Sequence, residues 1–456
     1  MKRWTAQHLY LLYSTILLLF IVNYFIESDI LGYAVGAAAI PMLVISFFGA
    51  SRLFQVLGII FSSVGLLLFF YEGTSLLEIP LFMTSTMPLL SFLTVLPWMT
   101  SVVYAGRFHL RLNDLLNKDV SDLGKFYPRS SFTAYIFTTF MNLSALTLSQ
   151  EVLNENMKNL SRKIKEAFIS RTTLRAFACA QAWSPMEIIV AITVDSTGVP
   201  FFSYLPWLLL CSLVVISLDW LFGKRQFTSI PYEPAEKTAT HHAGMRKIAM
   251  EIVKLFVALF LFLIIVVTIG NYFHLDFILS VTFVIIPFSI IWAMVLRRRK
   301  SFWVIGWNEW KRKTNGMQNF VVLFLSLAFF SNSLNETAFN ELVQKPFLAY
   351  MEYPLIIFIF IQLMFLLMGL IGVHAIATIG VLVAVLEPLY QVVNPISIGI
   401  VLITGALATA TVGPYGVTIT MTAMNTDQNP YRITLRNLPF ALFYASVGLL
   451  LGVWLL

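Results

Sequence analysis

The sequence has few of the residues on which soluble enzymes depend. Only 12% of its 456 residues are charged, and only two are cysteines. Cys179 and Cys211 both lie inside apolar runs, where a buried free thiol is the simplest interpretation. The patterns GxSxG, HExxH, CxxC and the P-loop are all absent. The soluble catalytic classes that those motifs mark therefore have no support, and the two thiols give no information on the redox compartment.

Apolar residues dominate instead. Hydrophobic residues make up 58% of the sequence, and its mean hydropathy is +0.81, values that soluble domains do not reach. About eleven runs have the roughly 17–25 apolar residues that a membrane-spanning helix needs. They lie near residues 9–26, 31–50, 53–71, 79–106, 173–195, 200–222, 246–271, 275–296, 317–333, 396–422 and 434–456. The sequence therefore predicts an all-α polytopic membrane protein, whose first run is a retained helix rather than a signal peptide.

Charged loops predict the orientation. Lys and Arg gather in four loops, at residues 107–129, 154–175, 223–247 and 297–313, whereas the alternate loops carry mainly Glu and Asp. Basic loops stay on the cytoplasmic side. We therefore expect a multi-pass protein of the plasma (inner) membrane with a cytoplasmic N-terminus and an external C-terminus. The net charge of +7 comes mostly from these loops, so nucleic acid is not an expected partner and the lipid bilayer is.

Two apolar stretches do not fit as crossings. Residues 132–153 have basic loops on both sides, so both ends belong on the cytoplasmic face. Residues 354–390 must likewise begin and end on the outer face. A segment that enters and leaves on one side is a re-entrant hairpin, which needs protein or a water-filled cavity around its backbone. We therefore predict two hairpins that enter from opposite faces.

Two spans are interrupted by short polar motifs, AQAWSPMEIIVAITVDST at 180–197 and TATVGPYGVTITMTAMNT at 409–426. Placing Ser184 over Gly413 gives an offset of 413 − 184 = 229, and placing the hairpin tips over each other, Ser144 on His374, gives 374 − 144 = 230. Each half then holds five crossings and a hairpin, and an odd number of crossings inverts the second copy. Paired interrupted helices in two halves point to a substrate site at the bilayer midplane.

The predicted organisation follows from this register. It comprises an extra N-terminal helix (1–30), a first inverted repeat (31–222, hairpin 132–153, broken helix 173–195), a cytoplasmic linker (223–245) and a second inverted repeat (246–456, hairpin 354–390, broken helix 396–422).

This architecture resembles the ion transporter superfamily, whose members include divalent anion/sodium symporters. Those symporters carry Ser-Asn-Thr at each hairpin tip, whereas this chain has Asn142-Leu143-Ser144 and Gly372-Val373-His374. The resemblance implies alternating access, sodium as a coupling ion and a scaffold that can form a homodimer.

A broken helix offers partly charged backbone ends, N–H groups for an anion and C=O groups for a cation. Polar residues near the breaks and tips are the candidate ligands. The candidate substrate-binding residues are Asn142, Ser144, Ser184, His374, Thr411, Gly413 and Pro414. The candidate ion-coupling residues are Glu187, Thr147, Gln181, Thr378, Thr409 and Thr418, with Na⁺ at the tips near Asn142, Ser144 and Gly372. The alternatives are structural, because membrane Ser and Thr often bond their own backbone and a histidine can bond a nearby carbonyl.

Glu187 is the most informative charge, because a carboxylate near mid-span costs about 2.5–3.5 kcal/mol on insertion scales and is by default a functional hypothesis. We expect it to bind sodium or carry a proton. Other ionisable residues in apolar runs, such as Asp219, lie close enough to span ends to reach the interface, and we expect no Arg or Lys deep enough to hold a substrate.

The sequence thus predicts a sodium- or proton-coupled secondary transporter of a small anionic, carboxylate-like solute, without an enzymatic activity or a cofactor. A cation/proton antiporter or exporter on the same fold is an alternative. A multi-span acyltransferase using His374 and residues 307–315 is a second one, but it explains neither the repeated register nor the second proline.

Overall fold

The structure is a computed structural model that describes residues 2–108, 120–232, 245–335, 337, 345, 350 and 352–456. The described residues form helices and short turns, with one isolated β-bridge between Asp122 and Pro231. Within them, nine helical stretches are long and apolar enough to cross a membrane, and a bent pair, Arg299–Asn315 with Gln318–Leu334, makes a possible tenth. The prediction of an all-α polytopic membrane protein is confirmed.

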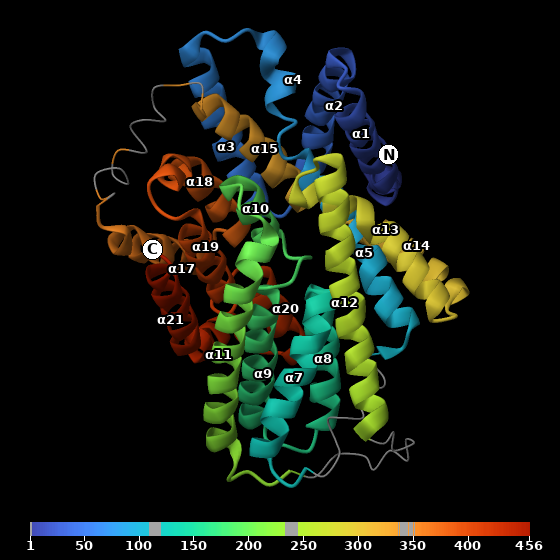
Figure 1. The fold of residues 1–456 in the computed structure, drawn as a ribbon, viewed down its shortest axis with the longest axis vertical. Coiled ribbons are helices and arrows are strands. Elements are labelled where there is room, and N and C mark those ends of the chain that lie inside the picture. Colours follow the sequence, from blue (N-terminus) through green and yellow to red (C-terminus); the bar gives the residue numbers. More distant parts are fainter. Residues whose placement is uncertain are drawn as a thin grey trace. The chain divides into compact units, whose positions relative to one another are not determined.

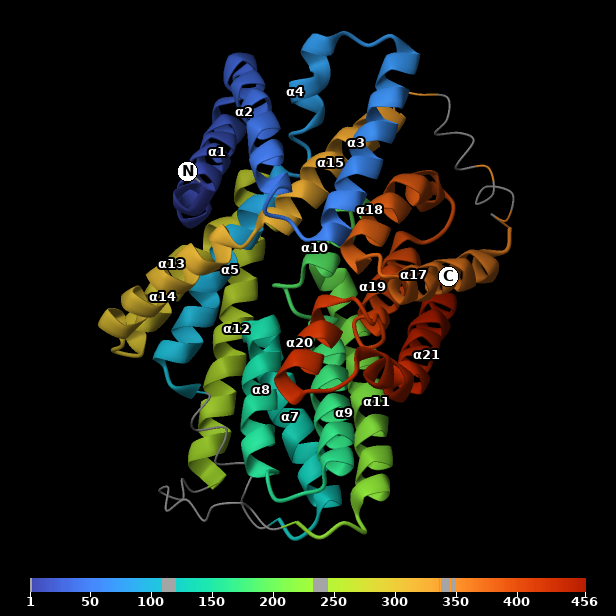
Figure 2. The same ribbon diagram turned by 180° about the vertical axis from the view of Figure 1, so that it is seen from behind.

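The chain divides into two compact units. Unit 1 comprises Met1–Ser101, Ile278–Ala349 and Gly380–Pro388. Its helices are α1 (Lys2–Ile26), α2 (Asp29–Phe47), α3 (Arg52–Glu72), η1 (Leu76–Glu78), α4 (Ile79–Phe82), α5 (Met87–Ala105), α13 (Phe277–Val295), α14 (Arg299–Asn315) and α15 (Gln318–Asn335). α15 packs along α3 and α2, and α1 packs on α2 and α14 (Figures 1 and 2). A Cβ added at Gly58 would lie 2.5 Å from Val322 Cγ1, so a small residue is needed where α3 meets α15.

Unit 2 comprises Val102–Phe277, Tyr350–Ile379 and Leu389–Leu456. Its helices are α7 (Leu123–Met141), α8 (Leu143–Asn156), α9 (Arg162–Gln181), α10 (Ile188–Thr197), α11 (Phe201–Phe227), α12 (Met245–Phe273), α17 (Pro354–Ile371), most of η2 (Glu387–Gln391), α19 (Pro395–Thr409), α20 (Val417–Thr426) and α21 (Pro430–Trp454). α18 (Ala375–Leu386) begins in unit 2 and ends in unit 1.

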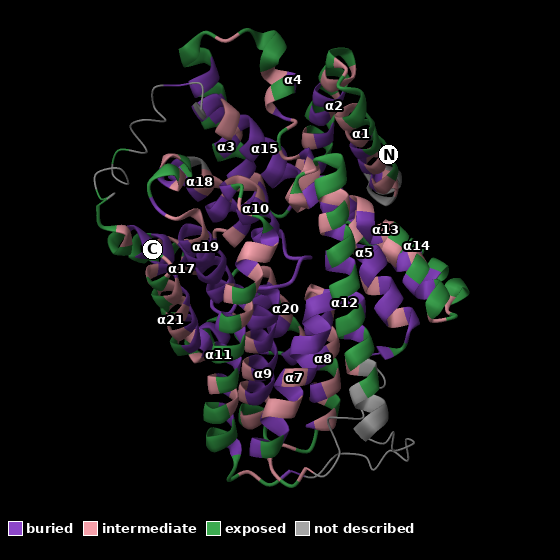
Figure 3. Cartoon of the chain, in the orientation of Figure 1, coloured by how far each residue is buried: buried purple, intermediate pink, exposed green. Residues whose placement is uncertain are grey.

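Helices that the sequence places far apart pack together in unit 2. α7 lies against α8, α9 and α11, while α17 lies against α19 and α21. α8 also contacts α20, and α10 contacts α19, so each interrupted helix touches a segment from the other half of the chain. Figure 3 shows α9 and α19 as largely buried helices, and every residue of α19 from Ser397 to Thr409 is buried. The two interrupted helices therefore form the centre of this unit.

The order of helices in unit 2 recurs along the chain. α7 and α17 begin 354 − 123 = 231 residues apart, α10 and α20 begin 417 − 188 = 229 apart, and α11 and α21 begin 430 − 201 = 229 apart. These intervals agree with the offsets of 229 and 230 between the sequence motifs. The opposite orientation of the two copies stays a prediction.

Contacts recur at the same interval. A Cβ on Gly223 would meet the ring of Tyr127, and one on Gly452 would lie 3.4 Å from Phe358 Cε2. The two pairs are separated by 452 − 223 = 229 and 358 − 127 = 231 residues. A close helix approach at a glycine is therefore used twice, once in each half.

Two regions differ from what the sequence suggested. The basic segment 297–313 was expected to be a loop, yet most of it forms α14. Pro354–Ile371 is long and apolar enough to pass as a span by itself, although the sequence suggested the first arm of a hairpin. Its helix ends at Gly372, where a positive φ of 102° turns the chain into α18. Most of the predicted linker, residues 233–244, lies outside the described residues.

Candidate functional site

The first break separates α9 from α10. α9 ends at Gln181 and α10 begins at Ile188, so the helix is interrupted around Pro185, which has no N–H to donate. Ser184 Oγ donates to the carbonyl of Thr139 at 3.1 Å and accepts from Met186 N at 3.3 Å. The Ser184 hydroxyl therefore attaches the non-helical segment to α7. It also fixes the turn that brings Glu187, three residues later, to Asn142 between α7 and α8.

Three N–H donors meet at the Glu187 carboxylate, which is 8% exposed. Gln181 Nε2 donates to Oε2 at 2.5 Å, and Asn142 Nδ2 donates to the same oxygen at 3.3 Å. The backbone N–H of Ile189 points to Oε1 at 3.4 Å, so Glu187 also caps α10. We call Asn142, Gln181, the N–H of Ile189 and the carboxylate they hold the Glu187 cradle.

The cradle joins three separate pieces of chain. Asn142 is the single residue between α7 and α8, and its φ of 48° with ψ of −133° lies outside the left-handed helical region, in a conformation that favours glycine. Gln181 is the last residue of α9, and Glu187 precedes α10. Gln181 Oε1 is buried and has no hydrogen-bond partner. The structure therefore brings together three of the residues that the sequence singled out, around one acidic group.

The second break separates α19, which ends at Thr409, from α20, which begins at Val417. Here the hydroxyls bond their own backbone. Thr409 Oγ1 donates to the carbonyl of Ala406 at 2.6 Å, and Thr411 Oγ1 to that of Ala408 at 2.8 Å. Thr418 Oγ1, in the first turn of α20, instead donates across the break to the carbonyl of Ala410, eight residues earlier. The structural alternative considered for membrane Ser and Thr therefore describes Thr409 and Thr411, whereas the Thr418 hydroxyl links the two sides of the break.

The second hairpin tip lies directly on the second break. A Cβ added at Gly369 would lie 3.2 Å from Thr409 Cβ, and one at Gly413 would lie 3.3 Å from the carbonyl oxygen of Gly369. A Cβ at Gly372 would lie 3.1 Å from Tyr415 Cδ2. These distances leave little room for larger side chains, so Gly413 and Gly372 serve close packing here, and Pro414 interrupts the helix beside them.

His374 caps a helix in this structure. Its Nδ1 accepts from the backbone N–H of Ile376 at 3.2 Å, at the start of α18. Thr378 Oγ1 lies 3.5 Å from the His374 carbonyl oxygen. Ser144 and Thr147 are half-buried in the first two turns of α8. The roles predicted for these four residues, in substrate or ion binding, stay predictions.

A cluster of buried amides and hydroxyls was missed from the sequence. Gln150 Nε2 donates to Thr422 Oγ1 at 2.7 Å and to Thr173 Oγ1 at 3.1 Å. Asn425 Nδ2 donates to Gln150 Oε1 at 2.9 Å. The cluster joins α8 and α9 to α20. A glutamine fully buried in an apolar hairpin was the available signal, but its partner Thr422 lies 272 residues away.

A buried ion pair was also missed. Arg175 Nη1 lies 2.6 Å from Asp219 Oδ1, and the two side chains are only 13% and 2% exposed. Tyr127 OH donates to Asp219 Oδ2 at 2.9 Å, and Arg175 Nε donates to Asn437 Oδ1 at 3.0 Å. The expectation that Asp219 reaches the interface was wrong, because its charge is compensated by Arg175 inside the protein. The expectation that no Arg or Lys lies deep enough in the membrane to hold a substrate stays a prediction.

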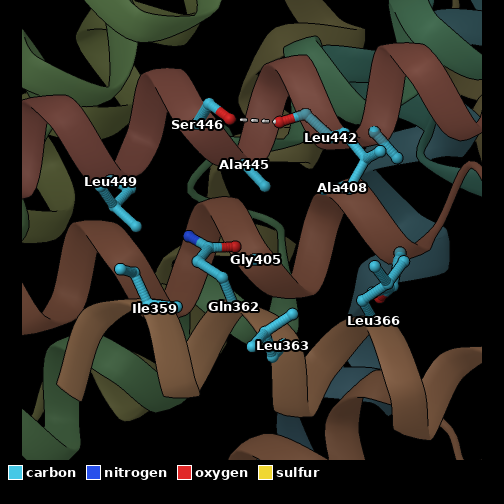
Figure 4. Close-up of a pocket in the computed structure, with 12 residues that line it drawn as sticks. Ile359, Gln362, Leu363, Leu366, Gly405, Ala408, Leu442, Ala445, Ser446 and Leu449 are labelled. Carbon is cyan, nitrogen blue, oxygen red and sulfur yellow. Dashed lines mark hydrogen bonds between the residues drawn. The ribbon is translucent and has the colours of Figure 1, made fainter. Parts of the chain in front are cut away.

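A cavity of about 130 Å³ lies between α17, α19 and α21 (Figure 4). Its walls are mainly Leu, Ile and Ala side chains, with Gln362 and Gly405 near its centre. Gln362 Nε2 donates to the carbonyl of Val401 at 3.1 Å. Among the candidate residues only Thr409 lines this cavity, so it is separate from the Glu187 cradle.

Within the part of the chain that the structure describes, no cluster of three or more His, Cys, Asp or Glu side chains could hold a metal ion. Sodium at the hairpin tips would depend on hydroxyl, amide and carbonyl oxygens, and it stays a prediction.

The comparisons with known proteins support the fold. No protein-family model matches the chain, and no curated protein matches it. Among solved structures, the Alcanivorax borkumensis YdaH transporter, described as having an unusual topology, matches with a TM-score of 0.59 over 88% of this chain and 98% of that one. The chain has the fold of a transporter. At 14% identity the likeness shows the fold alone, so membership of the ion transporter superfamily stays a prediction.

Proposed function

We propose that the protein is a secondary transporter that moves a small carboxylate-bearing anion across the membrane by alternating access, coupled to protons at Glu187. The fold shared with the YdaH transporter supports transport in general. The observation that carries the finer proposal is the Glu187 cradle, where N–H donors from a hairpin tip and from both sides of a helix break converge on one carboxylate.

The donors suit an anion better than a cation. Each group that contacts the Glu187 carboxylate presents hydrogen, from an amide side chain or a helix N-terminus, and such groups bind carboxylates with charge-assisted hydrogen bonds. Sodium would require several oxygen ligands, whereas apart from the carboxylate and Gln181 Oε1, which has no hydrogen-bond partner, the cradle presents N–H groups. We therefore favour the proton over sodium as the coupling ion, with sodium at the tips as the alternative to be tested.

Proton binding to Glu187 would free the N–H donors of the cradle. A protonated Glu187 is a weaker acceptor for Asn142 and Gln181, and those donors could then turn to the carboxylate of a substrate. Loss of the proton on the other side of the membrane would restore Glu187 as the competing acceptor and release the substrate. Proton and anion would thus move together, because protonation of Glu187 frees the N–H donors that the anion then binds.

The test uses purified protein in liposomes. Thermal unfolding is first screened against mono-, di- and tricarboxylates with and without sodium, and any stabilising anion is then used for uptake driven by a pH or a sodium gradient. We expect a pH gradient to drive accumulation in the native protein. Glu187→Gln should abolish this accumulation yet retain exchange of labelled for unlabelled substrate, because glutamine resembles the protonated acid.

Glu155→Gln is the matched control. Glu155 lies near the end of α8 with its side chain 75% exposed, paired only with Lys158, so its loss should leave accumulation unchanged. Accumulation that persists in Glu187→Gln, or that follows the sodium gradient alone, would overturn proton coupling at Glu187. The absence of stabilisation by any carboxylate would overturn the substrate class.

A proton/solute antiporter or exporter is the second candidate, favoured by the same ionisable residue at the break. In that case an inward proton gradient would drive the solute out rather than in. The acyltransferase alternative has no comparable support, because the Nδ1 atom of His374 is used to cap α18. Dimer formation by unit 1 is also a proposal, and the mass of the purified protein in detergent would test it.

A further inference from the structure

α14 packs on α5 and on α1, and part of its surface remains exposed. Phe302, Gly306 and Thr314 are buried, and their spacing in multiples of four places them on one side of the helix. The Phe302 ring lies 5.6 Å from the Trp98 ring of α5, and a Cβ on Gly306 would lie 2.6 Å from Trp98 Cζ3. α14 is therefore packed closely on α5 within unit 1.

The outward face of α14, its exposed surface, carries large aromatic and apolar side chains that are partly packed on their neighbours, since the Trp303 ring lies 5.4 Å from that of Trp98 and the Trp307 ring 4.9 Å from that of Trp310. Trp303, Val304 and Trp307 are 45%, 63% and 47% exposed. Tryptophan is enriched where membrane proteins meet the headgroup region, because its ring is apolar and its N–H is polar. A helix that presents two half-exposed tryptophans beside an exposed valine is suited to that region.

Four adjacent positive charges, Arg297 to Lys300, stand at the beginning of α14. Arg297, Arg299 and Lys300 are exposed. Within the described residues, no salt bridge joins any of the four to a carboxylate. Like charges so close together repel one another, and they also lie at the positive end of the helix dipole. An external anion would relieve both effects.

The surface is held rigidly by α1. Tyr10 N donates to Asn315 Oδ1 at 2.8 Å, which ties α1 to the end of α14. Lys311 Nζ lies 5.1 Å from the Trp307 ring centre and 5.3 Å from that of Tyr10. This cation–π contact orders Trp307 from the protein side. Contacts within the protein therefore hold Trp307 in place on the outward face of α14.

We propose that this face of α14 binds anionic phospholipid at the membrane surface. Arg297, Arg299 and Lys300 would contact the lipid phosphates, while Trp303 and Trp307 would lie at the boundary between headgroups and acyl chains. Charge complementarity and the aromatic face together select a lipid over a soluble anion, because a free phosphate uses only the charges. This binding is independent of the proposed transport cycle.

The experiment measures lipid binding to the full chain. Purified protein in neutral detergent is titrated with phosphatidylglycerol, phosphatidylcholine or inorganic phosphate, and bound lipid is counted by native mass spectrometry. We expect preferential binding of phosphatidylglycerol by the native protein. The triple variant Arg297→Gln/Arg299→Gln/Lys300→Gln should weaken that binding about tenfold or more.

The matched control removes three exposed positive charges elsewhere, with Lys163→Gln/Lys224→Gln/Arg225→Gln, and should bind phosphatidylglycerol like the native protein. Equal losses of phosphatidylglycerol binding in both triple variants would overturn the proposal. Binding of inorganic phosphate as tight as that of phosphatidylglycerol would overturn it too.

A second measurement does not depend on the triple variant folding. Brominated phosphatidylglycerol quenches tryptophans at the headgroup boundary, and the quenched fraction should fall in Trp303→Phe/Trp307→Phe relative to the native protein. An unchanged quenched fraction would place α14 away from the lipid and would overturn the proposal as well.

Discussion

The two breaks interrupt similar helices, yet they are built differently. At the first, side chains from a hairpin tip and from the preceding helix reach across to hold the Glu187 carboxylate. At the second, the hydroxyls of Thr409 and Thr411 bond to the helix that carries them, and glycines let the hairpin tip approach. The same interruption of a helix is therefore used for polar recognition in one half and for close packing in the other.

The register between the halves shows how the difference arises. At an offset of 229, Gln181 corresponds to Ala410 and Glu187 to Gly416, and at an offset of 230 Asn142 corresponds to Gly372. Each side chain of the Glu187 cradle is thus replaced by a residue with no polar side chain. The second half cannot form such a cradle, so we expect coupling to be asymmetric.

The buried ion pair follows the same rule. Arg175 corresponds to Thr404 (404 − 175 = 229) and Asp219 to Gly448 (448 − 219 = 229). A Cβ on Gly448 would lie 2.0 Å from Thr404 Oγ1, so the second pair is also in contact. In the first half an ion pair joins these helices. In the second half Gly448, which has no side chain, lets the helices pack closely against Thr404.

Removal of Arg175 should have the largest effect on stability. Arg175→Ala leaves Asp219 buried with only Tyr127 as a hydrogen-bond partner, and loss of one member of a buried ion pair typically costs about 3–5 kcal/mol. The free energy of unfolding in detergent would measure it. The double variant Arg175→Ala/Asp219→Ala should recover much of the loss. A double variant as unstable as the single one would show that packing, rather than charge, is what Arg175 supplies.

Converting the first hairpin tip into a copy of the second should weaken substrate binding with little effect on folding. Asn142→Gly removes one donor from the Glu187 cradle and the Oδ1 that accepts from Leu143 N at the start of α8, a loss offset by relaxing a backbone with φ of 48°, which glycine adopts readily. We expect the apparent affinity for the transported anion to fall about tenfold. Uptake at graded substrate concentrations gives the number.

The control for that variant comes from the second break. Thr411→Val keeps the shape of the side chain and removes a hydroxyl that donates to the carbonyl of Ala408. Its affinity should change less than about twofold. If Thr411→Val weakened binding as much as Asn142→Gly, the contrast between the two breaks would not hold.

Local rules predicted the backbone of this site. Proline cannot donate a hydrogen bond, so Pro185 and Pro414 marked both interruptions, and apolar runs marked most of the spans. The charges on either side of residues 132–153 predicted a hairpin there, and the register between the two halves placed its tip at Asn142. None of these inferences needed a contact between residues far apart in the sequence.

Contacts between distant residues could not be predicted in the same way. Arg175 and Asp219 are 44 residues apart, and both lie near span ends, where a charge usually reaches water. Only packing between α9 and α11 shows that they compensate each other. The basic segment that became α14 was misjudged because its charges obscured the buried face formed by Phe302, Gly306 and Thr314. The sequence identified candidate hydroxyls at both breaks but could not show that those at the second bond locally.

The smallest effect is expected at the start of the first arm of each hairpin, where α7 has a side-chain cap and α17 has none. Asp122 caps α7 by accepting from Lys125 N at 2.9 Å, whereas the residue before α17, Tyr353, makes no side-chain cap. That hydrogen bond, with smaller contributions from Ser121 and the Lys125 charge, lowers the pKa of Asp122 below its ordinary value. A lowered pKa in the folded protein means that the stabilisation is complete above the pKa of the unfolded chain, about 3.9, and is lost as pH falls through the folded value.

Asp122→Ala should therefore lower the unfolding temperature slightly at pH 7, and the difference from native protein should shrink below about pH 4. Asp122→Asn, which can still cap the helix, should lie between the two at pH 7, and a difference that persists unchanged in acid would show that the carboxylate charge plays no part.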